Sequence, residues 1–427
     1  MTYAEAIRFL YDLRWFGAKL GLENTFKLAA LAGNPQEQLR FIHVAGTNGK
    51  GSVCAMLESI YRTAGLRVGL FTSPHLVAFG ERIQVNRHLI DEEEVTRLVS
   101  EVQALLGAFP ASAHPTFFEV VTVMALRYFA EQQCNLVIWE TGLGGRLDAT
   151  NIVIPLASVI TNIQFDHEKW LGPTLAEIAF EKAGIIKPGI PVITATDQRT
   201  ALQVIAETAK RHGSPLIVVT RLDTARPPLD AIALPLRGEH QRLNAAVTLA
   251  TVRTLAPELP VTEEAMVTGL SQVDWPGRLQ LETTVSGQSV LLDGAHNPAG
   301  AESLRAVLQT CFPTVKPTLI LGILRDKDCE AICQILAPLA NHICLAPVAS
   351  DRTAVPEELK SLCRKAHPEA QVAVCSGLAE ALTLAADAPF LVITGSLHFV
   401  GEAMELLRLL PGKAAEERSL NEWKAAP

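Results

Sequence analysis

Residues 41–52 contain the residue types that bind the phosphates of a nucleotide. An apolar run, Phe-Ile-His-Val-Ala, is followed by Gly-Thr-Asn-Gly-Lys-Gly-Ser, and a helical pattern begins after Lys50. Glycine adopts positive φ angles freely, so these glycines let backbone N–H groups turn inward as an anion-binding nest at a helix start. The Lys50 ammonium suits the terminal phosphates, and the Ser52 hydroxyl suits a Mg²⁺ ion carried by the nucleotide. A plain strand-to-helix turn is the alternative, but the joint pattern favours a phosphate loop made of Gly46, Thr47, Asn48, Gly49, Lys50, Gly51 and Ser52.

Three acidic or basic residues follow later strands. A buried strand predicted at 135–139 ends at Glu140, and a strand predicted at 157–161 is followed by Asp166 and His167. A carboxylate at a strand end facing a phosphate loop is placed to bind Mg²⁺ through oxygen. The Gly-Gly pair after Glu140 also fits an ordinary tight turn, and a lone histidine is usually structural. The neighbouring Asp166 and the shared rim favour a ligand or substrate role for His167.

Further charged residues lie on the remaining segments. Lys182 belongs to a helix that starts at a capping box, and composition alone favours a surface salt bridge for it. Arg278 precedes a strand that ends in the sequence Asp-Gly-Ala-His-Asn-Pro at 293–298. Asn297 and Pro298 are typical of the N-cap and first residue of a helix, whose N-terminus would be a second anion site facing the first across an interdomain cleft.

The elements that must position these groups alternate between strands and helices. This alternation predicts an α/β fold with a mostly parallel sheet covered on both faces, in which ligands collect beyond the carboxyl ends of the strands. Gly46, Ser73, Glu140 and Asn162 all follow predicted strands, so we expect them on one rim. Residues 72–86 are predicted to be a loop.

A break in the pattern at 275–278 and a polar stretch at 283–289 mark a predicted domain boundary. We predict a P-loop-type domain at 1–278 and a second, smaller Rossmann-like α/β domain at 283–427. Residues 412–427 are predicted to be a loosely held tail.

Composition excludes several classes of protein. The chain has 427 residues, of which 48% are hydrophobic and 19% charged, with a net charge of −8. A nucleic-acid or membrane-surface binder would need a basic face, so we expect neither partner. The apolar runs are too short for a membrane span and the N-terminus lacks signal-peptide features, so we expect a cytoplasmic protein. This architecture can bury a complete core as a monomer.

Ten stretches of the chain, in order, resemble the folylpolyglutamate synthase/dihydrofolate synthase family of the Mur ligase superfamily. They extend over about residues 40–402 and are 46–52, 72–75, 81–83, 140–151, 161–167, 181–187, 240–244, 293–298, 326–328 and 394–397. The resemblance implies an ATP-dependent amide ligase. In such enzymes a substrate carboxylate attacks the γ-phosphate of ATP, and the amine of L-glutamate then displaces phosphate from the acyl phosphate. The acceptors implied are reduced folates, extended through the γ-carboxylate, and also dihydropteroate.

The resemblance also implies the roles of individual residues. The catalytic residues would be Lys50, Glu140, His167, Lys182, Arg278 and His296, of which Lys50, Arg278 and His296 contact phosphate. Two Mg²⁺ ions would be held by Ser52, Ser73, Glu140, His167 and a carbamylated Lys182, and a monovalent cation is a further candidate cofactor. Asn244 and Asp293 would contact adenine and ribose. The pterin site would consist of Ser73, Pro74, His75, Thr116, Phe118, Asp148 and Ala149, and the incoming glutamate would meet Ser396 and His398.

Three alternatives remain open. Phe117 and Phe118 also fit the core face of a helix. A peptidoglycan-precursor Mur ligase would share the phosphate loop, but Asp148, the Asp-Lys-Asp at 326–328 and the lack of a UDP-binding domain before Gly46 favour the folate family. A nucleotide-driven switch protein would hydrolyse ATP without a carboxylate acceptor, and Glu140, His167 and Lys182 would then be expendable.

Overall fold

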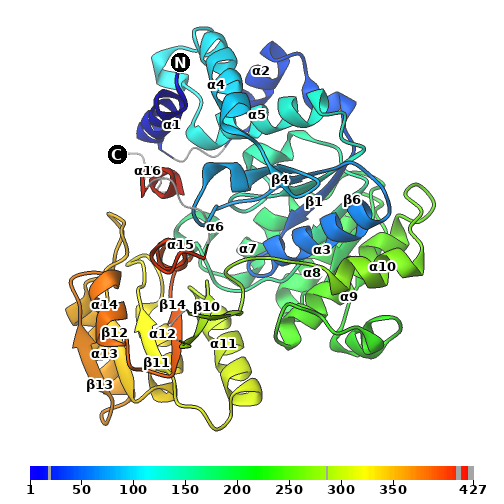
Figure 1. Cartoon of the computed structure of the whole chain (residues 1–427). Coiled ribbons are helices and arrows are strands. Elements are labelled where there is room, and N and C mark those ends of the chain that lie inside the picture. Colours follow the sequence, from blue (N-terminus) through cyan, green and yellow to red (C-terminus); the bar gives the residue numbers. More distant parts are fainter. Residues whose placement is uncertain (18–20, 285–286, 410–414, 422–427) are drawn as a thin grey trace.

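Two β-sheets, joined near residue 279, organise the chain (Figure 1). The computed structural model describes residues 1–17, 21–284, 287–409 and 415–421. The first sheet has eight strands in the order β4-β3-β2-β5-β1-β6-β7-β8, and its neighbouring strands pair in parallel except for β2 with β3 and β3 with β4. The strands are β1 (Phe41–Ala45), β2 (Val68–Phe71), β3 (Ile83–Val85), β4 (His88–Leu89), β5 (Leu136–Glu140), β6 (Ala157–Ile160), β7 (Val192–Thr194) and β8 (Leu216–Val218).

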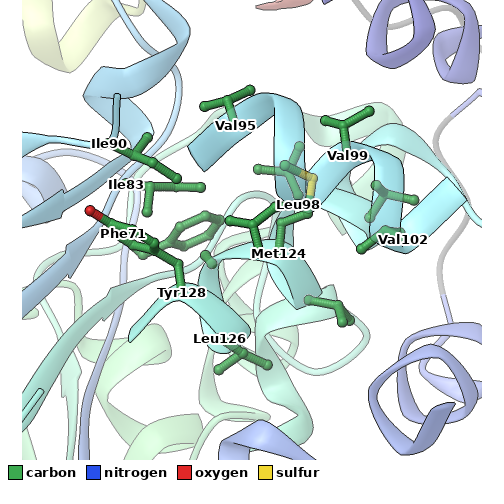
Figure 2. Close-up of a cluster of buried hydrophobic side chains, with 14 of the residues drawn as sticks. Phe71, Ile83, Ile90, Val95, Leu98, Val99, Val102, Met124, Leu126 and Tyr128 are labelled. Atoms are coloured by element: carbon green, nitrogen blue, oxygen red, sulfur yellow. The ribbon is translucent and has the colours of Figure 1, made fainter. Parts of the chain in front are cut away.

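Helices cover both faces of this first sheet because its central strands are apolar on both sides. Successive residues of a strand point to opposite faces. Phe41 and Trp139 pack with α4 and α5, whereas Ile42 and Ile138 pack with α3 and α9. Figure 2 shows side chains of α4 and α5 gathered against Phe71 and Ile83. The helices are α1 (Tyr3–Asp12), α2 (Glu23–Leu31), α3 (Lys50–Thr63), α4 (Glu92–Leu106), α5 (Phe117–Glu131), α6 (Glu168–Leu171), α7 (Leu175–Ala183), α8 (Arg199–Arg211), α9 (Glu239–Thr254) and α10 (Glu263–Ser271).

The second sheet has six strands in the order β13-β12-β11-β14-β10-β9, parallel except for β9. Its core lies on both faces, with Leu291 packed against α11 to α13 and Leu292 against α14 and α15. The elements are β9 (Gln280–Thr283), β10 (Ser289–Asp293), α11 (Pro298–Cys311), β11 (Thr318–Leu321), α12 (Cys329–Leu336), β12 (His342–Leu345), α13 (Pro356–Ala366), β13 (Gln371–Val374), α14 (Leu378–Leu384), β14 (Phe390–Thr394) and α15 (Leu397–Leu406).

The two units are packed together. Leu76 and Val77 of the first unit belong to the same apolar cluster as α14 and α15 of the second. The second sheet begins with β9, which the sequence pattern did not predict and which starts inside the gap at 279–282 left between the predicted domains. The position of the domain boundary itself stays a prediction.

The loop predicted at 72–86 is wrong in part, because it contains a strand. Ile83–Val85 forms β3, which is buried and pairs antiparallel with β2. Its alternation of apolar, polar and apolar residues extends over only three positions, too few to stand out in the sequence.

The tail predicted at 412–427 is also wrong where the structure describes it; residues 412–414 and 422–427 lie outside the described residues. Helix α16 (Ala415–Arg418) and the 3₁₀-helix η9 (Ser419–Asn421) lie between α1 and α15 (Figure 1). The Glu417 carboxylate accepts a hydrogen bond from Phe79 N at 2.8 Å. Arg418 pairs with Glu405 of α15 at 2.7 Å. Residues 415–421 therefore join the first unit to the second.

None of the helices in the described ranges is long and apolar enough to cross a bilayer.

Candidate active site

The carboxyl ends of four adjacent strands form the floor of the site. Strands β2, β5, β1 and β6 are neighbours in the sheet, and Ser73, Glu140, Gly46 and Asn162 lie at or just beyond their ends. These four residues therefore share one rim, as expected from the sequence. A cavity of about 380 Å³ opens there and is lined by both units.

The phosphate loop has a shape that only glycine permits at two positions. Gly46 and Gly49 have φ angles of +146° and +86°. A Cβ atom on Gly46 would lie 1.9 Å from Thr161 Oγ1, and one on Gly49 would lie 2.5 Å from Asn244 Oδ1. The glycines thus permit a close backbone approach as well as a turn.

Hydrogen bonds from the two residues that follow β6 hold the loop in place. Asn48 N donates to Asn162 Oδ1 at 2.8 Å, and Thr161 Oγ1 donates to Asn48 O at 2.7 Å. The Lys50 ammonium donates to the Gly46 and Thr47 carbonyls at 3.2 and 3.3 Å. The loop therefore has a defined shape at the start of α3, where N–H groups and the helix dipole favour an anion.

Glu140 presents an almost fully buried carboxylate beside this loop. It is 4% exposed and accepts a hydrogen bond from Ser73 N at 3.0 Å. Burial raises the pKa of Glu140, while the Lys50 charge and the Ser73 N–H oppose the rise. A cation near Glu140 would compensate the buried negative charge.

These residues fit a Mg²⁺ ion that arrives with a nucleotide. Among the described residues, no group of three or more His, Cys, Asp or Glu side chains forms a ready-made metal cage. Mg²⁺ is commonly held by one or two carboxylates together with substrate phosphates and water. Glu140 and the buried Ser52 hydroxyl, to which Gln241 Nε2 donates at 3.2 Å, match that donor set.

Lys182 is buried, so the surface salt bridge that composition favoured is wrong. It is 5% exposed, and its Nζ donates to Gly46 O at 2.7 Å. Glu181 instead makes the surface ion pair, with Arg146 at 2.8 Å. Burial, reinforced by the Lys50 charge, lowers the pKa of Lys182 to about 7. A capping box and a helical pattern did not reveal which face of α7 this residue occupies.

His167 is a neutral imidazole in this site. Burial lowers its pKa to about 3, although the Asp166 charge opposes the shift. A neutral ring nitrogen is the form that coordinates metals. The residue lies in the left-handed region at φ +53°, where α6 begins.

A charge cluster connects this rim to the second unit. The Asp166 carboxylate lies 2.5 Å from Lys327 Nζ and 3.4 Å from His296 Nε2. Burial acts to raise the pKa of Asp166, but the hydrogen bond from His296 and the nearby cations hold it well below its usual range. Asn48 and Asn297 exchange two side-chain hydrogen bonds of 3.2 and 3.0 Å. The phosphate loop therefore contacts the N-cap of α11 directly.

The residues predicted to meet the nucleoside lie beside the loop. Asn244 Nδ2 donates to Gln241 Oε1 at 3.0 Å. Both carboxylate oxygens of Asp293 accept backbone hydrogen bonds, from Leu279 N at 2.9 Å and Ala295 N at 3.1 Å. Burial raises the pKa of Asp293 and lowers that of Arg278, and the attraction between the two groups opposes both shifts.

The far end of the cavity is formed by an aromatic residue and a carboxylate. Phe118, half-buried in the first turn of α5, lies 6.0 Å from Phe71 between ring centroids. Asp148, 5% exposed, accepts hydrogen bonds from Leu143 N at 2.7 Å and Thr150 N at 3.0 Å, and burial raises its pKa. Thr116 is the N-cap of α5 in a capping box.

The second unit contributes a further helix N-terminus. Ser396 is the N-cap of α15, and its hydroxyl accepts a hydrogen bond from His398 N at 3.2 Å. Burial, followed by the charge of Arg352, lowers the pKa of His398 to about 3, so its imidazole is neutral.

Comparison with known proteins places this geometry in a family. Residues 44–252 match the Mur ligase middle domain, and residues 277–397 match the Mur ligase glutamate ligase domain. A dihydrofolate synthase/folylpolyglutamate synthase of Bacillus subtilis (strain 168) is 37% identical over 95% of this chain and 99% of that protein. The chain belongs to the folylpolyglutamate synthase/dihydrofolate synthase family of Mur ligases.

Solved structures agree with this assignment. A folylpolyglutamate synthase from Thermotoga maritima has 35% identity and a TM-score of 0.83, with 97% of this chain and 98% of that chain covered. The Escherichia coli FolC protein in complex with DHPP and ADP has 31% identity and a TM-score of 0.83, with 96% and 98% covered. The family and α/β fold class expected from the sequence are confirmed, and with them the enzyme class, an ATP-dependent ligase.

The structure brings nearly all predicted site residues of this Mur ligase to the one cavity. Each of them lines it except His75. His75 is 1% exposed, with Nδ1 accepting from Arg82 Nε at 2.7 Å and Nε2 bonded to Glu417 O at 2.8 Å. It therefore positions its neighbours instead of facing the cavity.

Sequence reasoning missed several cavity residues of this ligase. They are Arg14, Arg82, Lys327, Arg352, Leu420 and Asn421. Arg82 and Lys327 lie within stretches that match the family, which was the available signal. Arg14 and Asn421 belong to no local sequence pattern. Tertiary packing alone brings their segments to the cavity, so the sequence offered no signal for them.

Proposed function

We propose that this enzyme adds L-glutamate to folates and to dihydropteroate in an ATP-dependent, ADP-forming reaction. One cavity lined by the phosphate loop, Glu140, the Phe118–Asp148 end and Ser396 is the observation that supports the proposal most directly. The relatives named dihydrofolate synthase/folylpolyglutamate synthase support the choice of acceptor. The acceptor would lie with its ring at the aromatic end and its carboxylate at the phosphate loop.

The first step is phosphoryl transfer, which needs positioning and charge neutralisation more than covalent help. Backbone N–H groups of the loop and Lys50 hold the terminal phosphates, while Arg278 and His296 approach from the other side of the cavity. A carboxylate oxygen of the acceptor attacks the γ-phosphorus, the bond to ADP breaks, and an acyl phosphate forms. Ser52, Ser73, Glu140 and His167 would hold two Mg²⁺ ions, which supply further neutralisation of phosphate charge when bound.

The second step is acyl transfer to glutamate. The α-amine of L-glutamate attacks the acyl carbon, phosphate leaves, and one proton is lost as the amide forms. Ser396 and His398, on the first turn of α15, are the residues we assign to the incoming glutamate. Asn244 and Asp293 are assigned to the adenine and ribose of ATP.

Lys182 is proposed to act as its carbamate. A neutral amine adds to carbon dioxide with release of one proton, which converts a cation into an anion. Burial and a pKa of about 7 leave much of this amine neutral at physiological pH. The charge reversal matters beside Mg²⁺, since two unit charges 4 Å apart interact by about 4 kcal/mol at an effective dielectric constant of 20. Activity is expected to fall in carbonate-free buffer and to return on addition of bicarbonate.

The pterin ring is assigned to Ser73, Pro74, Thr116, Phe118, Asp148 and Ala149. A half-buried aromatic face suits a flat heterocycle, and a carboxylate accepts hydrogen bonds from its 2-amino and N3–H groups. His75 supports this end of the site through Arg82 and residues 415–421.

An ADP-release assay with ATP, Mg²⁺, L-glutamate and either tetrahydrofolate or dihydropteroate tests the function. Stimulation by both acceptors is expected. Stimulation by only one would restrict the activity to that acceptor. A response to a UDP-sugar amino acid instead of either pterin would overturn the assignment in favour of a peptidoglycan-precursor ligase. ADP release independent of any acceptor would favour a nucleotide switch.

The monomeric state, the cytoplasmic location and the monovalent cation stay predictions. Size-exclusion chromatography with light scattering tests the first of them.

A further inference from the structure

Arg14 has a buried guanidinium group with unused hydrogen-bond donors at the wall of the cavity. The residue is 6% exposed and lies in the 3₁₀-helix η1 (Leu13–Phe16). Its Nε and Nη1 atoms are buried without a hydrogen-bond partner among residues 1–17, 21–284, 287–409 and 415–421. The guanidinium carbon lies over the ring of Tyr11, 4.2 Å from its centroid.

A buried guanidinium with unpaired donors costs folding free energy unless a ligand accepts hydrogen bonds from it. A buried polar group without a partner loses its hydration and gains nothing in return, and the cost is greater for a charged group. Arg14 lines the same cavity as the phosphate loop. The missing partner is therefore expected to be a molecule that enters the cavity.

The position of Arg14 indicates which molecule it meets. η1 and the 3₁₀-helix η5 (Ala149–Ile152), which Asp148 caps, both pack against α5. Leu13, Phe117 and Leu420 belong to one apolar cluster, against which Phe118 packs. Arg14 thus lies at the aromatic end, where the proposed function puts the ring of the acceptor.

The ring has two edges with opposite requirements. Its 2-amino and N3–H groups are donors, and they suit the carboxylate of Asp148, which only accepts. Its 4-oxo oxygen and, in the 7,8-dihydro form, its N5 atom are acceptors. They suit a guanidinium, which only donates and presents its donors in a planar fork.

We propose that Arg14 binds the 4-oxo edge of the pterin ring, opposite in character to the edge bound by Asp148; this rests on the proposed function. Arg14 is then a specificity-determining residue for the acceptor. A 2,4-diamino analogue carries an amino donor where the natural ring has the 4-oxo acceptor. Its amino group would therefore face the donors of the guanidinium without forming a hydrogen bond. The wild-type enzyme is expected to discriminate against that analogue.

The experiment compares Arg14→Met with the wild-type full chain in the ADP-release assay. The KM for dihydropteroate is expected to rise about 10- to 100-fold, the range for hydrogen bonds to a charged group, while the KM values for ATP and glutamate stay within about threefold. The preference for the 4-oxo acceptor over its 4-amino analogue should fall toward one. Arg14→Lys, which keeps the charge but lacks the fork, should give an intermediate KM.

Arg8→Met provides the matched control, because Arg8 is an exposed arginine on the adjacent helix α1. It should behave as wild type in every measurement. The melting temperature separates a binding role from a structural one. Removal of an unpaired buried charge should leave it unchanged or raise it, whereas a structural arginine would lower it.

Three results would overturn the inference. These are an unchanged KM for dihydropteroate in Arg14→Met, a wild-type enzyme that accepts 4-oxo and 4-amino acceptors equally, and an equal loss of affinity for 4-aminobenzoylglutamate, which lacks the ring. Failure of the proposed function itself is distinct, because the wild-type enzyme would then show no acceptor-stimulated ADP release with any pteridine.

Discussion

We assign one end of the cavity to the nucleotide and the other end to the acceptor, and these two ends are built in different ways. At the nucleotide end, Gly46, Ser73 and Glu140 lie at or just beyond the ends of neighbouring strands of one sheet, so its topology fixes their positions. The acceptor end combines η1, the first turn of α5, the segment before η5 and the residues of η9, which are far apart in sequence.

This difference predicts that substitutions at the two ends change the kinetics in different ways. A change at the nucleotide end should lower the rate with every acceptor alike, because all acceptors use the same phosphates. Changes at the acceptor end should instead alter the KM for the acceptor and leave that for ATP nearly unchanged. The following variants test this contrast.

Glu140→Gln is expected to have the largest effect. It keeps the shape of the side chain but removes the charge that would hold Mg²⁺, which is worth several kcal/mol in the transition state. The kcat should fall by about 10³-fold or more with both tetrahydrofolate and dihydropteroate. Glu181→Gln, in the surface pair with Arg146, is the control and should stay within about threefold. More than a tenth of wild-type activity in Glu140→Gln would contradict the assigned role.

Lys182→Met is expected to abolish turnover and to stabilise the fold. The pKa of this lysine is about 7 in the folded protein and about 10.5 when unperturbed. Between these values the unfolded chain binds a proton that the folded chain does not, so the wild-type free energy of unfolding rises with pH across that window. The variant lacks this term and should be more stable at pH 7 by up to about 4 kcal/mol.

Urea unfolding in carbonate-free buffer at pH 7 and pH 9 measures the effect of Lys182→Met. The advantage of the variant should shrink at pH 9. An equal advantage at both values, or a loss of stability at pH 7, would show that Lys182 is not held neutral.

Asp166→Asn tests the contact between the two units. Asp166 and Lys327 each have side chains only 7% exposed, so loss of the carboxylate leaves a buried cation unpaired. The free energy of unfolding should fall by about 3 kcal/mol, and the double variant with Lys327→Met should recover most of it. If the double variant is as unstable as the sum of both single variants, the two residues do not act as a pair.

Asn421→Ala is expected to have the smallest effect and to be selective. Asn421 accepts a hydrogen bond from Arg82 at 2.5 Å and donates one to His75 O at 2.8 Å. Its loss should therefore loosen the part of the cavity wall that we assign to the pterin. The acceptor KM should rise about three- to tenfold, in line with about 1 kcal/mol for a lost hydrogen bond, with the ATP KM unchanged. The exposed Asn341→Ala is the control. An equal rise in both KM values would remove the contrast between the two ends.

The same contrast explains what the sequence predicts well. The loop from Gly46 to Ser52 and the carboxylate of Glu140 belong to short local patterns, and alternation of strands and helices is enough to put them on one rim. The strands predicted at 135–139 and 157–161 are therefore found within one residue of those bounds, as β5 and β6.

Long-range packing accounts for the rest. The burial of Lys182 depends on which face of α7 meets the sheet. The orientation of the His75 side chain depends on Glu417, which follows it in the sequence by 342 residues. Arg14 stands out only in the structure, where the Nε and Nη1 donors of its guanidinium lack a hydrogen-bond partner among the described residues at the wall of the cavity. Such features depend on tertiary neighbours, which no local spacing encodes.

The hydrogen bond between His75 and Glu417 also has a consequence for the order in which the enzyme is synthesised and folds. The ribosome adds about 5–20 residues per second, so the 342 positions between them take roughly 20 to 70 s to translate. Throughout that interval the nascent chain has its phosphate loop but lacks the Glu417 contact at the wall that we assign to the acceptor. The phosphate loop is therefore translated well before this wall is complete.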